Sequence, residues 1–256
     1  MDNGSTRKSA AIATDASCGN GRAAIVTGAS SGIGRAVSER LGGMGYEVFG
    51  FGREFADEPL WEKDRMHPVV CDLLDTQKLC GCVKSIQAQY AVHVLVNNAG
   101  VGYYGLHEEL NPQKIQQMVR TNLEVPMILA QQLLRDLKKH TGYLIQIASV
   151  TAHKTNPHGC AYGATKAGLA SFSASLFEEA RKYGVKAVTI SPDMTKSGLY
   201  RNADFCEGDD ADSYLLPEET AAAVEYVLCQ REGMAITDLT LRPQRHQIKR
   251  QIKKKT

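Results

Sequence analysis

The sequence lacks any run of apolar residues long enough to cross a membrane, so we expect no membrane span. A spanning helix needs about 18 or more consecutive apolar residues. Among the first 21 residues the longest apolar run is 10–13, which is too short for the core of a secretory signal peptide. Asp2 and Asp15 also argue against a transit peptide. We therefore expect a cytoplasmic protein in which residues 1–21 form a disordered N-terminal extension.

Cysteine is present, but it is not spaced for a disulfide framework or for metal binding. The seven cysteines are an odd number, form no CxxC pair and have no histidines at ligand-like spacing. Cys80 and Cys82 are close in sequence but too isolated to indicate a metal site. The sequence thus predicts a reducing compartment and no bound metal.

Net charge is also small, +2 from 30 basic and 28 acidic residues, but it is unevenly distributed. Residues 242–256 hold seven basic residues and no acid, which leaves a net charge of −5 on the rest of the chain. No aromatic residue lies within this basic C-terminal tail, so we expect no nucleic-acid partner. The tail is predicted to be a solvated or subunit-contacting extension, and removal of residues 247–256 is expected to spare catalysis.

Between the two ends, β-rich runs alternate with longer amphipathic runs. Residues 23–26, 46–51, 68–71, 92–96, 143–147, 185–190 and 235–241 are predicted strands, and residues 76–90, 112–139, 161–183 and 217–230 are predicted helices. Asn111 before Pro112, and Gly184 after the third of these helices, supply start and stop signals. No linker or internal repeat divides the chain. This pattern predicts one doubly wound α/β domain over residues 22–241, with a parallel sheet covered on both faces.

Three glycines separate the first predicted strand from the helix that follows it. Gly28, Gly32 and Gly34 allow a tight turn and a close approach of the backbone to a pyrophosphate, which the N-terminus of a helix attracts. Their spacing is GxxxGxG rather than the GxGxxG of many dinucleotide enzymes. A structural glycine-rich turn is the alternative interpretation.

Tyr162 and Lys166 are four residues apart and therefore lie on one face of a helix. A tyrosine becomes a useful base near neutral pH only if its pKa falls from about 10, and a neighbouring ammonium group favours the phenolate. Ser149, at the end of a predicted strand, offers a hydroxyl to the reacting oxygen. A solvated tyrosine–lysine pair is the alternative.

Pro126 lies inside a predicted helix, where it should produce a kink and free the carbonyl of Asn122. A freed carbonyl needs a partner, and an ordered water is the natural one. A tolerated kink without function is the alternative.

Taken in order and spacing, these segments resemble the short-chain dehydrogenase/reductase family. The resemblance rests on segments 27–34 and 97–100 together with Asn122, Ser149, Tyr162 and Lys166, and it covers roughly residues 22–241. It implies a Rossmann-type domain with a seven-stranded parallel sheet, a nicotinamide cofactor and a catalytic set of Asn122, Ser149, Tyr162 and Lys166.

Each member of this catalytic set then has an implied role. Tyr162 would be the general acid/base and Ser149 would orient the substrate carbonyl. Lys166 would hold the nicotinamide ribose and lower the pKa of Tyr162, and Asn122 would anchor a water that relays protons. The implied cofactor-binding residues are Gly28, Ser30, Ser31, Gly32, Ile33, Gly34, Arg53, Asp72, Leu73, Asn98, Ala99, Gly100, Tyr162, Lys166, Pro192, Met194 and Thr195.

The end of the second predicted strand favours NADP(H) over NAD(H). An NAD enzyme places a carboxylate near this point to bind the ribose 2′-hydroxyl, but Gly52 stands there. Arg53 follows, and a guanidinium pairs well with a 2′-phosphate. Two observations oppose this preference: Glu54 could be the carboxylate, and Ser31 replaces a basic residue common in NADP-preferring members.

Three positions depart from the family pattern. Asp193 replaces a glycine after Pro192, which puts the loop geometry there in question. His93 stands where an acid is frequent, and we interpret it as structural. The segment around residues 235–243 lacks a common Asp-Gly-Gly and is more similar to reductases of small 3-hydroxy-acid or related carbonyl substrates.

The sequence therefore predicts an NADP(H)-dependent oxidoreductase that interconverts a carbonyl and an alcohol, of the 3-oxoacyl or small hydroxy-acid type. A hydroxysteroid dehydrogenase and a catalytically idle NADP sensor are the alternatives. The predicted pocket walls are Tyr103, Tyr104, Val150, Thr151, His153, His158 and a lid over residues 195–214, whose acids are expected to face solvent. The family's usual helix contacts imply a homodimer or homotetramer, through residues 112–139 and 161–183, with small residues at Ala164, Gly168 and Ser171.

Overall fold

The computed structural model describes residues 21–55 and 59–250. The predicted N-terminal extension, apart from Gly21, lies outside the described residues, as does the end of the basic tail from residue 251.

Seven parallel strands form the central sheet in the order β3-β2-β1-β4-β5-β6-β8. Their bounds are β1 Arg22–Thr27, β2 Glu47–Gly52, β3 Met66–Val70, β4 Ala91–Asn97, β5 Tyr143–Ile147, β6 Lys186–Pro192 and β8 Asp238–Leu241. Each coincides with a predicted strand to within a few residues, so the predicted doubly wound α/β sheet is confirmed. The strand order reverses beside β1. In this fold class ligands bind at such a point, outside the carboxyl ends of the strands.

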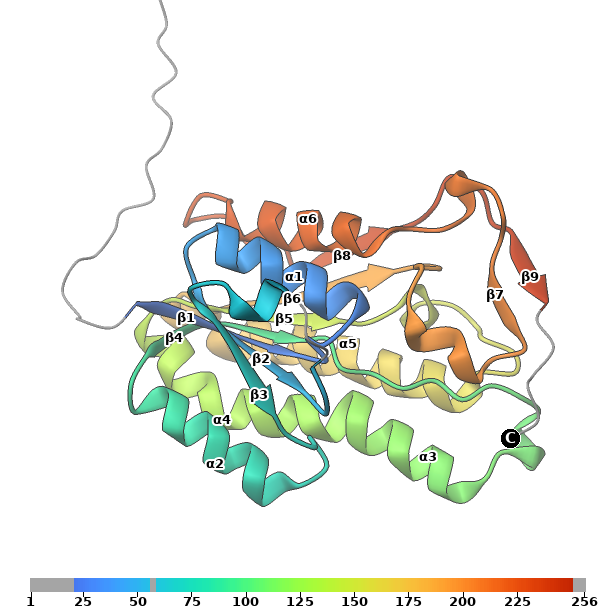
Figure 1. Cartoon of the computed structure of the whole chain (residues 1–256), viewed down its shortest axis with the longest axis horizontal. Coiled ribbons are helices and arrows are strands. Elements are labelled where there is room, and N and C mark those ends of the chain that lie inside the picture. The colour runs from blue at the N-terminus through green and yellow to red at the C-terminus, as the bar shows by residue number, and fades with distance from the viewer. Residues whose placement is uncertain (1–20, 56–58, 251–256) are drawn as a thin grey trace, which may run out of the picture.

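Helices cover both faces of the sheet (Figure 1). On one face lie α1 Gly32–Gly43 and α6 Pro217–Leu228, and on the other lie α2 Thr76–Gln87, α4 Val125–Lys139 and α5 Cys160–Ala180. Each face has its own apolar core. Strand β6 is buried along its whole length and β1 along all but its first residue, as expected for central strands covered on both sides.

The helix termini follow the local signals in the sequence. The Asn111 side chain accepts a hydrogen bond from the amide of Gln113 at the start of α3 Pro112–Val119. Gly184 ends the segment after α5 with a φ of 78°, a conformation that glycine adopts without steric cost. These contacts explain why sequence patterning located the helices well.

The predicted helix 112–139 is interrupted. A π-helical turn, Arg120–Glu124, joins α3 to α4 directly before Pro126, where the amide of Val125 donates to the carbonyl of Arg120. Such turns often mark functional sites.

Strand register brings the functional segments to one edge of the sheet. Val26 pairs with Val96, Val96 with Ile145, and Ile145 with Val188, so one row crosses four strands. Strands β1, β4, β5 and β6 end one to four residues beyond that row, so the segments that follow them begin at the same edge.

Two short strands were not predicted. β7 Phe205–Glu207 and β9 Ile248–Arg250 pair in an antiparallel ribbon at the edge of the molecule (Figure 1). β9 belongs to the basic tail, so this part of the tail contacts the lid instead of forming only a solvated extension. Within residues 21–55 and 59–250, no helix is both long and apolar enough to span a membrane.

Candidate active site

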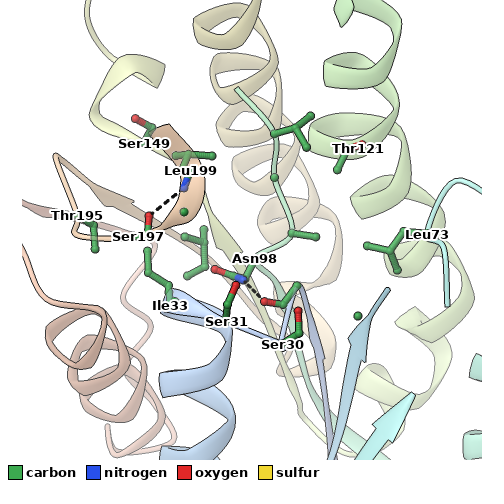
Figure 2. A pocket seen from close by; sticks show the side chains of 18 of the residues that line it. Ser30, Ser31, Ile33, Leu73, Asn98, Thr121, Ser149, Thr195, Ser197 and Leu199 are labelled. Carbon is green, nitrogen blue, oxygen red and sulfur yellow. Dashed lines mark hydrogen bonds between the residues drawn. The ribbon is translucent and has the colours of Figure 1, made fainter. Parts of the chain in front are cut away.

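A cleft of about 280 Å³ opens at the carboxyl edge of the sheet, where the predicted motifs converge. It is lined from the glycine turn, from the ends of β2 to β6, from α3 and α5, and from the lid. Figure 2 shows how the labelled residues surround it, with Ser30, Ser31 and Ile33 near Asn98, and Leu73 opposite.

The glycine turn is a close-packed structure in which side chains are excluded. Gly28 has a φ of +65°, and a Cβ there would lie 2.9 Å from the Cα of Ala99. A Cβ on Gly34 would collide with the carbonyl oxygen of Gly28. Gly28 and Gly32 line the cleft, whereas Gly34 packs behind the turn.

Thr27 fastens the glycine turn to the end of β4. Its hydroxyl oxygen accepts hydrogen bonds from the amides of Asn98 and Ala99, each at 3.0 Å. The Asn98 side chain donates to the carbonyls of Thr27 at 3.0 Å and Gly28 at 3.2 Å. Asn98 therefore lines the cleft and also holds two of its walls together.

At the end of β2, the structure distinguishes Arg53 from Glu54. Arg53 lines the cleft, whereas Glu54 is not among its lining residues. A Cβ on Gly52 would lie 2.9 Å from the Phe55 ring and 3.2 Å from the Cβ of Ser30, so a carboxylate side chain there would need both to move. Asp72 and Leu73 line the adjoining wall, and Asp72 accepts a hydrogen bond from the amide of Leu74.

Asn122 is fully buried within the π-helical turn, behind the cleft lining. Its side chain bonds both the amide and the carbonyl of Val101 at 2.9 Å and donates to the hydroxyl of Thr165 at 3.1 Å. This side chain therefore ties the segment after β4 to α5.

Ser149, Tyr162 and Lys166 all line the deeper part of the cleft and are all buried. The Ser149 oxygen accepts a hydrogen bond from the amide of Thr151, which leaves its hydroxyl proton available to a partner in the cleft. The Lys166 ammonium donates to the carbonyl of Ile147 at 2.8 Å. Gly100 lies beside it, since a Cβ there would be 3.6 Å from the lysine nitrogen.

The pKa of Tyr162 moves in the direction opposite to the one expected. Burial raises it to about 12 and outweighs the lowering by a hydrogen bond from Ser149. Lys166 lies 5.9 Å from the centre of the tyrosine ring, and burial lowers its own pKa to about 8. In the protein without cofactor, therefore, Lys166 does not lower the pKa of Tyr162 below its ordinary value.

Asp193 fits its position without backbone strain. The non-glycine residues with positive φ in the described chain are Arg65, Thr141 and His158, so Asp193 keeps an ordinary conformation. Its carboxylate accepts a hydrogen bond from the amide of Met194 at 2.9 Å and lies 3.9 Å from the Lys154 ammonium.

Beyond Tyr162, an aromatic wall borders the cleft: Tyr200 lines the cleft, and Tyr104 and Phe205 pack behind that ring. We use this name for Tyr104, Tyr200 and Phe205. The Tyr104 ring lies 5.6 Å from that of Tyr162 and 5.0 Å from that of Phe205, and Tyr200 lies 5.5 Å from Phe205.

Several residues that were predicted to line the pocket do not line the cleft. Tyr103, Tyr104, Val150, Thr151, His153 and His158 are not among the lining residues, although Tyr104 packs on Tyr162. The His153 ring is held by Ser191 at 3.2 Å. His93 is held by the carbonyl of Ala91 at the opposite end of β4 and plays no part in the cleft.

Most predicted cofactor-binding residues share the cleft. Those that line it are Gly28, Ser30, Ser31, Gly32, Ile33, Arg53, Asp72, Leu73, Asn98, Ala99, Gly100, Tyr162, Lys166, Pro192 and Thr195, while Gly34 and Met194 do not. The sequence missed Gln117, Thr121 and Ala148, which line it too. No motif marks these three residues. Arg201, within the predicted lid, brings a cation to the lining.

The chain matches the short chain dehydrogenase family over residues 22–205, and it therefore belongs to that family. Its enzyme class is that of an oxidoreductase acting on CH–OH groups.

Individual relatives agree with this assignment. An uncharacterized oxidoreductase of Staphylococcus epidermidis is 28% identical over 242 residues, which cover 93% of this chain and 98% of the relative. A metagenomic short-chain oxidoreductase solved in complex with NADP is 26% identical, with a TM-score of 0.72 over 88% of this chain and 98% of its own. A 3-ketoacyl-(acyl-carrier-protein) reductase from Brucella melitensis complexed with NADH shares the fold at 22% identity, with a TM-score of 0.74 over 87% and 97% of the two chains.

Proposed function

We propose that the protein is an NADP(H)-dependent oxidoreductase that interconverts a ketone or aldehyde with its alcohol, with Tyr162 as the general acid/base. The observation that carries this proposal is the convergence of Ser149, Tyr162 and Lys166 on one buried end of the cleft, with Asn122 directly behind them.

The outer part of the cleft fits a dinucleotide. Helix α1 begins without a side-chain cap, so its first amides remain available, and Gly32 and Ile33 at this end line the cleft. An uncapped helix N-terminus attracts a pyrophosphate. Lys166 and Gly100 would lie beside the nicotinamide ribose. When bound, the cofactor supplies or accepts a hydride.

Arg53 supports the preference for NADP(H). Of the two charged residues after Gly52, only Arg53 lines the cleft, where a guanidinium would pair with a 2′-phosphate. A carboxylate of the kind that an NAD enzyme uses would fit at Gly52 only if Phe55 and Ser30 moved.

The raised pKa of Tyr162 suits proton donation. Because burial keeps the phenol protonated at neutral pH, its hydroxyl can donate to a carbonyl oxygen in the cleft. The Ser149 hydroxyl bonds Tyr162 in the chain without substrate; with substrate bound, it would turn its one proton to the carbonyl oxygen and so hold the carbonyl in place. In the opposite direction, Tyr162 must first lose its proton, and the nearby Lys166 ammonium favours the phenolate that results.

Asn122 would position the route by which this proton is exchanged with solvent. Its side chain is fully committed to Val101 and Thr165, which fixes the π-helical turn beside the cleft. Its main-chain carbonyl, freed by Pro126, would hold the relay water.

The aromatic wall supports a substrate with apolar bulk next to its carbonyl, such as a 3-oxoacyl or aryl group. On that side Tyr200 presents its ring to the cleft, and Tyr104 and Phe205 pack against it. A homodimer or homotetramer and a cytoplasmic location stay predictions from the family resemblance and from the sequence.

The test is consumption of NADPH by the purified protein over a panel of ketones and aldehydes. Tyr162→Phe removes the proton donor and keeps the ring, so turnover should fall by about 10²- to 10⁴-fold while NADPH affinity stays nearly unchanged. Retained turnover would exclude Tyr162 as the acid/base. If no carbonyl compound consumes NADPH but the cofactor still binds, the protein is an idle sensor instead.

A further inference from the structure

The lid and the basic tail carry opposite charges and lie against each other. The lid segment 204–212 holds five acids, Asp204, Glu207, Asp209, Asp210 and Asp212. The tail contributes Arg245, Lys249 and Arg250 to the same edge of the molecule. The lid acids were expected to face solvent; none of them lines the cleft, and Asp209 and Asp210 are exposed and Asp212 partly so, while all three also pair with these cations.

Two cations of the tail are paired with lid acids. The Arg245 guanidinium lies 3.0 Å from the Asp212 carboxylate and 3.7 Å from that of Asp210. The Lys249 ammonium donates to both oxygens of Asp209, at 2.8 and 2.9 Å.

The backbones are joined as well. Strand β9 pairs with β7 so that Phe205 is opposite Arg250 and Glu207 is opposite Ile248. The amide of Arg245 donates to the carbonyl of Asp212 at 2.9 Å. We call this set of contacts, between residues 245–250 and 205–212, the clasp.

The clasp is connected to Tyr162 through the rings of Phe205 and Tyr104. Phe205 belongs to β7, and its ring packs on Tyr104, which packs on Tyr162. The backbone of the tail thus fixes the strand that carries the outermost residue of the aromatic wall.

The clasp is also weak enough that its stability should depend on salt concentration. Each strand has three residues, and an isolated two-stranded ribbon is marginal in water. Its ion pairs are exposed, and such pairs weaken as salt is added, because the screening length falls from about 10 Å at 0.1 M to about 3 Å at 1 M. Charge pairing therefore adds a salt-sensitive contribution to the stability of the ribbon.

From these contacts we propose that Arg245 and Lys249 are positioning residues for the carbonyl substrate. They act through β7, which they hold so that Phe205 supports the ring of Tyr200, which lines the cleft, and the ring of Tyr104, which packs on Tyr162. The substrate part of this proposal rests on the proposed function; the clasp itself does not. It also revises the expectation for truncation, because loss of the tail should spare kcat yet weaken substrate binding.

The test compares the full chain with a chain that ends at Pro243. With NADPH and 1-phenyl-1,2-propanedione, an aryl ketone probe, the truncated chain should show a KM about fivefold higher, as expected from the loss of exposed ion pairs and a short ribbon. The kcat should change less than twofold and the Kd of NADPH not at all. In the full chain the same KM should rise with added salt, and in the truncated chain it should not.

Point variants identify the charges. Arg245→Glu should raise the KM, Arg245→Lys should largely restore it, and Arg245→Glu combined with Asp212→Arg should recover most of the loss. Arg242→Glu is the matched control. It makes the same charge change three residues earlier, at a residue that has no ion pair with the described part of the chain, and it should leave KM unchanged.

Amide hydrogen exchange gives a second readout that needs no turnover. Amides of residues 205–207 should exchange faster in the truncated chain, while those of α5 keep their rates. Unchanged exchange at 205–207 overturns the clasp. Faster exchange at 205–207 together with an unchanged KM, at low and at high salt, overturns the positioning role. If the full chain turns over no carbonyl compound of the whole panel, the proposed function is overturned and amide exchange alone decides the clasp.

Discussion

At the scale of single residues, burial decides the chemistry of the site. The spacing of Tyr162 and Lys166 could be found in the sequence, but the direction of the tyrosine pKa could not. A pKa depends on how much water the folded chain removes from the group, and this is set by distant segments such as the one that carries Tyr104. The sequence therefore indicated a candidate proton donor but not the direction in which its pKa shifts.

Lys166 makes the stability of the cofactor-free protein depend on pH. Burial lowers its pKa from 10.5 to about 8, so between these values the unfolded chain binds more protons at this site than the folded chain. Stability thus rises with pH through this window. Lys166→Met lacks this titration. The free energy of unfolding of the variant minus that of wild type should therefore fall by up to about 3 kcal/mol between about pH 8 and pH 10.

Urea unfolding of the two proteins across that range measures the difference. The pKa of Tyr162 is raised to about 12 and opposes the trend only above pH 10, because only there does the unfolded chain lose a proton that the folded chain keeps. A pH-independent difference would mean that Lys166 titrates in the folded protein at its ordinary pKa.

Arg53 should choose between the two nicotinamide cofactors. Arg53→Ala should weaken NADPH by about tenfold, the loss of one charge-assisted hydrogen bond, with little effect on NADH. Glu54→Ala is the neighbouring control and should change neither affinity. Binding of both cofactors can be followed by fluorescence titration, and preferential loss of NADH in Glu54→Ala would favour the carboxylate alternative instead.

At the scale of elements, hydrogen bonds between strand ends explain how the cleft keeps its shape. Strand and helix positions were predictable because apolar periodicity and capping residues are local. The π-helical turn was only partly predictable: Pro126 indicated a disruption, but the bonds of Asn122 to Val101 and Thr165 come from segments far away in the sequence.

Thr27 provides a test at this scale. Thr27→Val keeps the shape of the side chain but leaves the amides of Asn98 and Ala99 without their acceptor. We expect the free energy of unfolding to fall by about 2 to 4 kcal/mol, because a buried unpaired amide costs about 1 to 3 kcal/mol and these two amides are partly buried.

Ser38→Ala is the matched control. The Ser38 hydroxyl is buried too, but it only donates to the carbonyl of Gly34 within α1, at 2.8 Å. Its loss should cost about 1 kcal/mol or less. Equal losses of stability in the two variants, measured by urea unfolding, would show that Thr27 does not fasten β1 to β4.

At the scale of the whole molecule, the uneven charge of the chain acquires a structural meaning. The sequence showed an acidic body and a basic tail, and the structure joins the two at the clasp. Pairing between such distant segments, with only three residues in each strand, leaves no local pattern from which it could have been predicted. The lid and the tail, rather than the Rossmann core, are therefore the parts that sequence reasoning described least well.

Transfer of deuterium to a carbonyl compound from NADPH that is deuterated at both C4 positions tests the central claim most directly. In the wild-type protein, mass spectrometry of the product should show an alcohol with one deuterium on the carbon that carried the carbonyl oxygen. The Tyr162→Phe variant, which should bind the same cofactor, should form little of this product. An absence of labelled alcohol with wild-type protein, or equal labelling by the variant, would contradict the account.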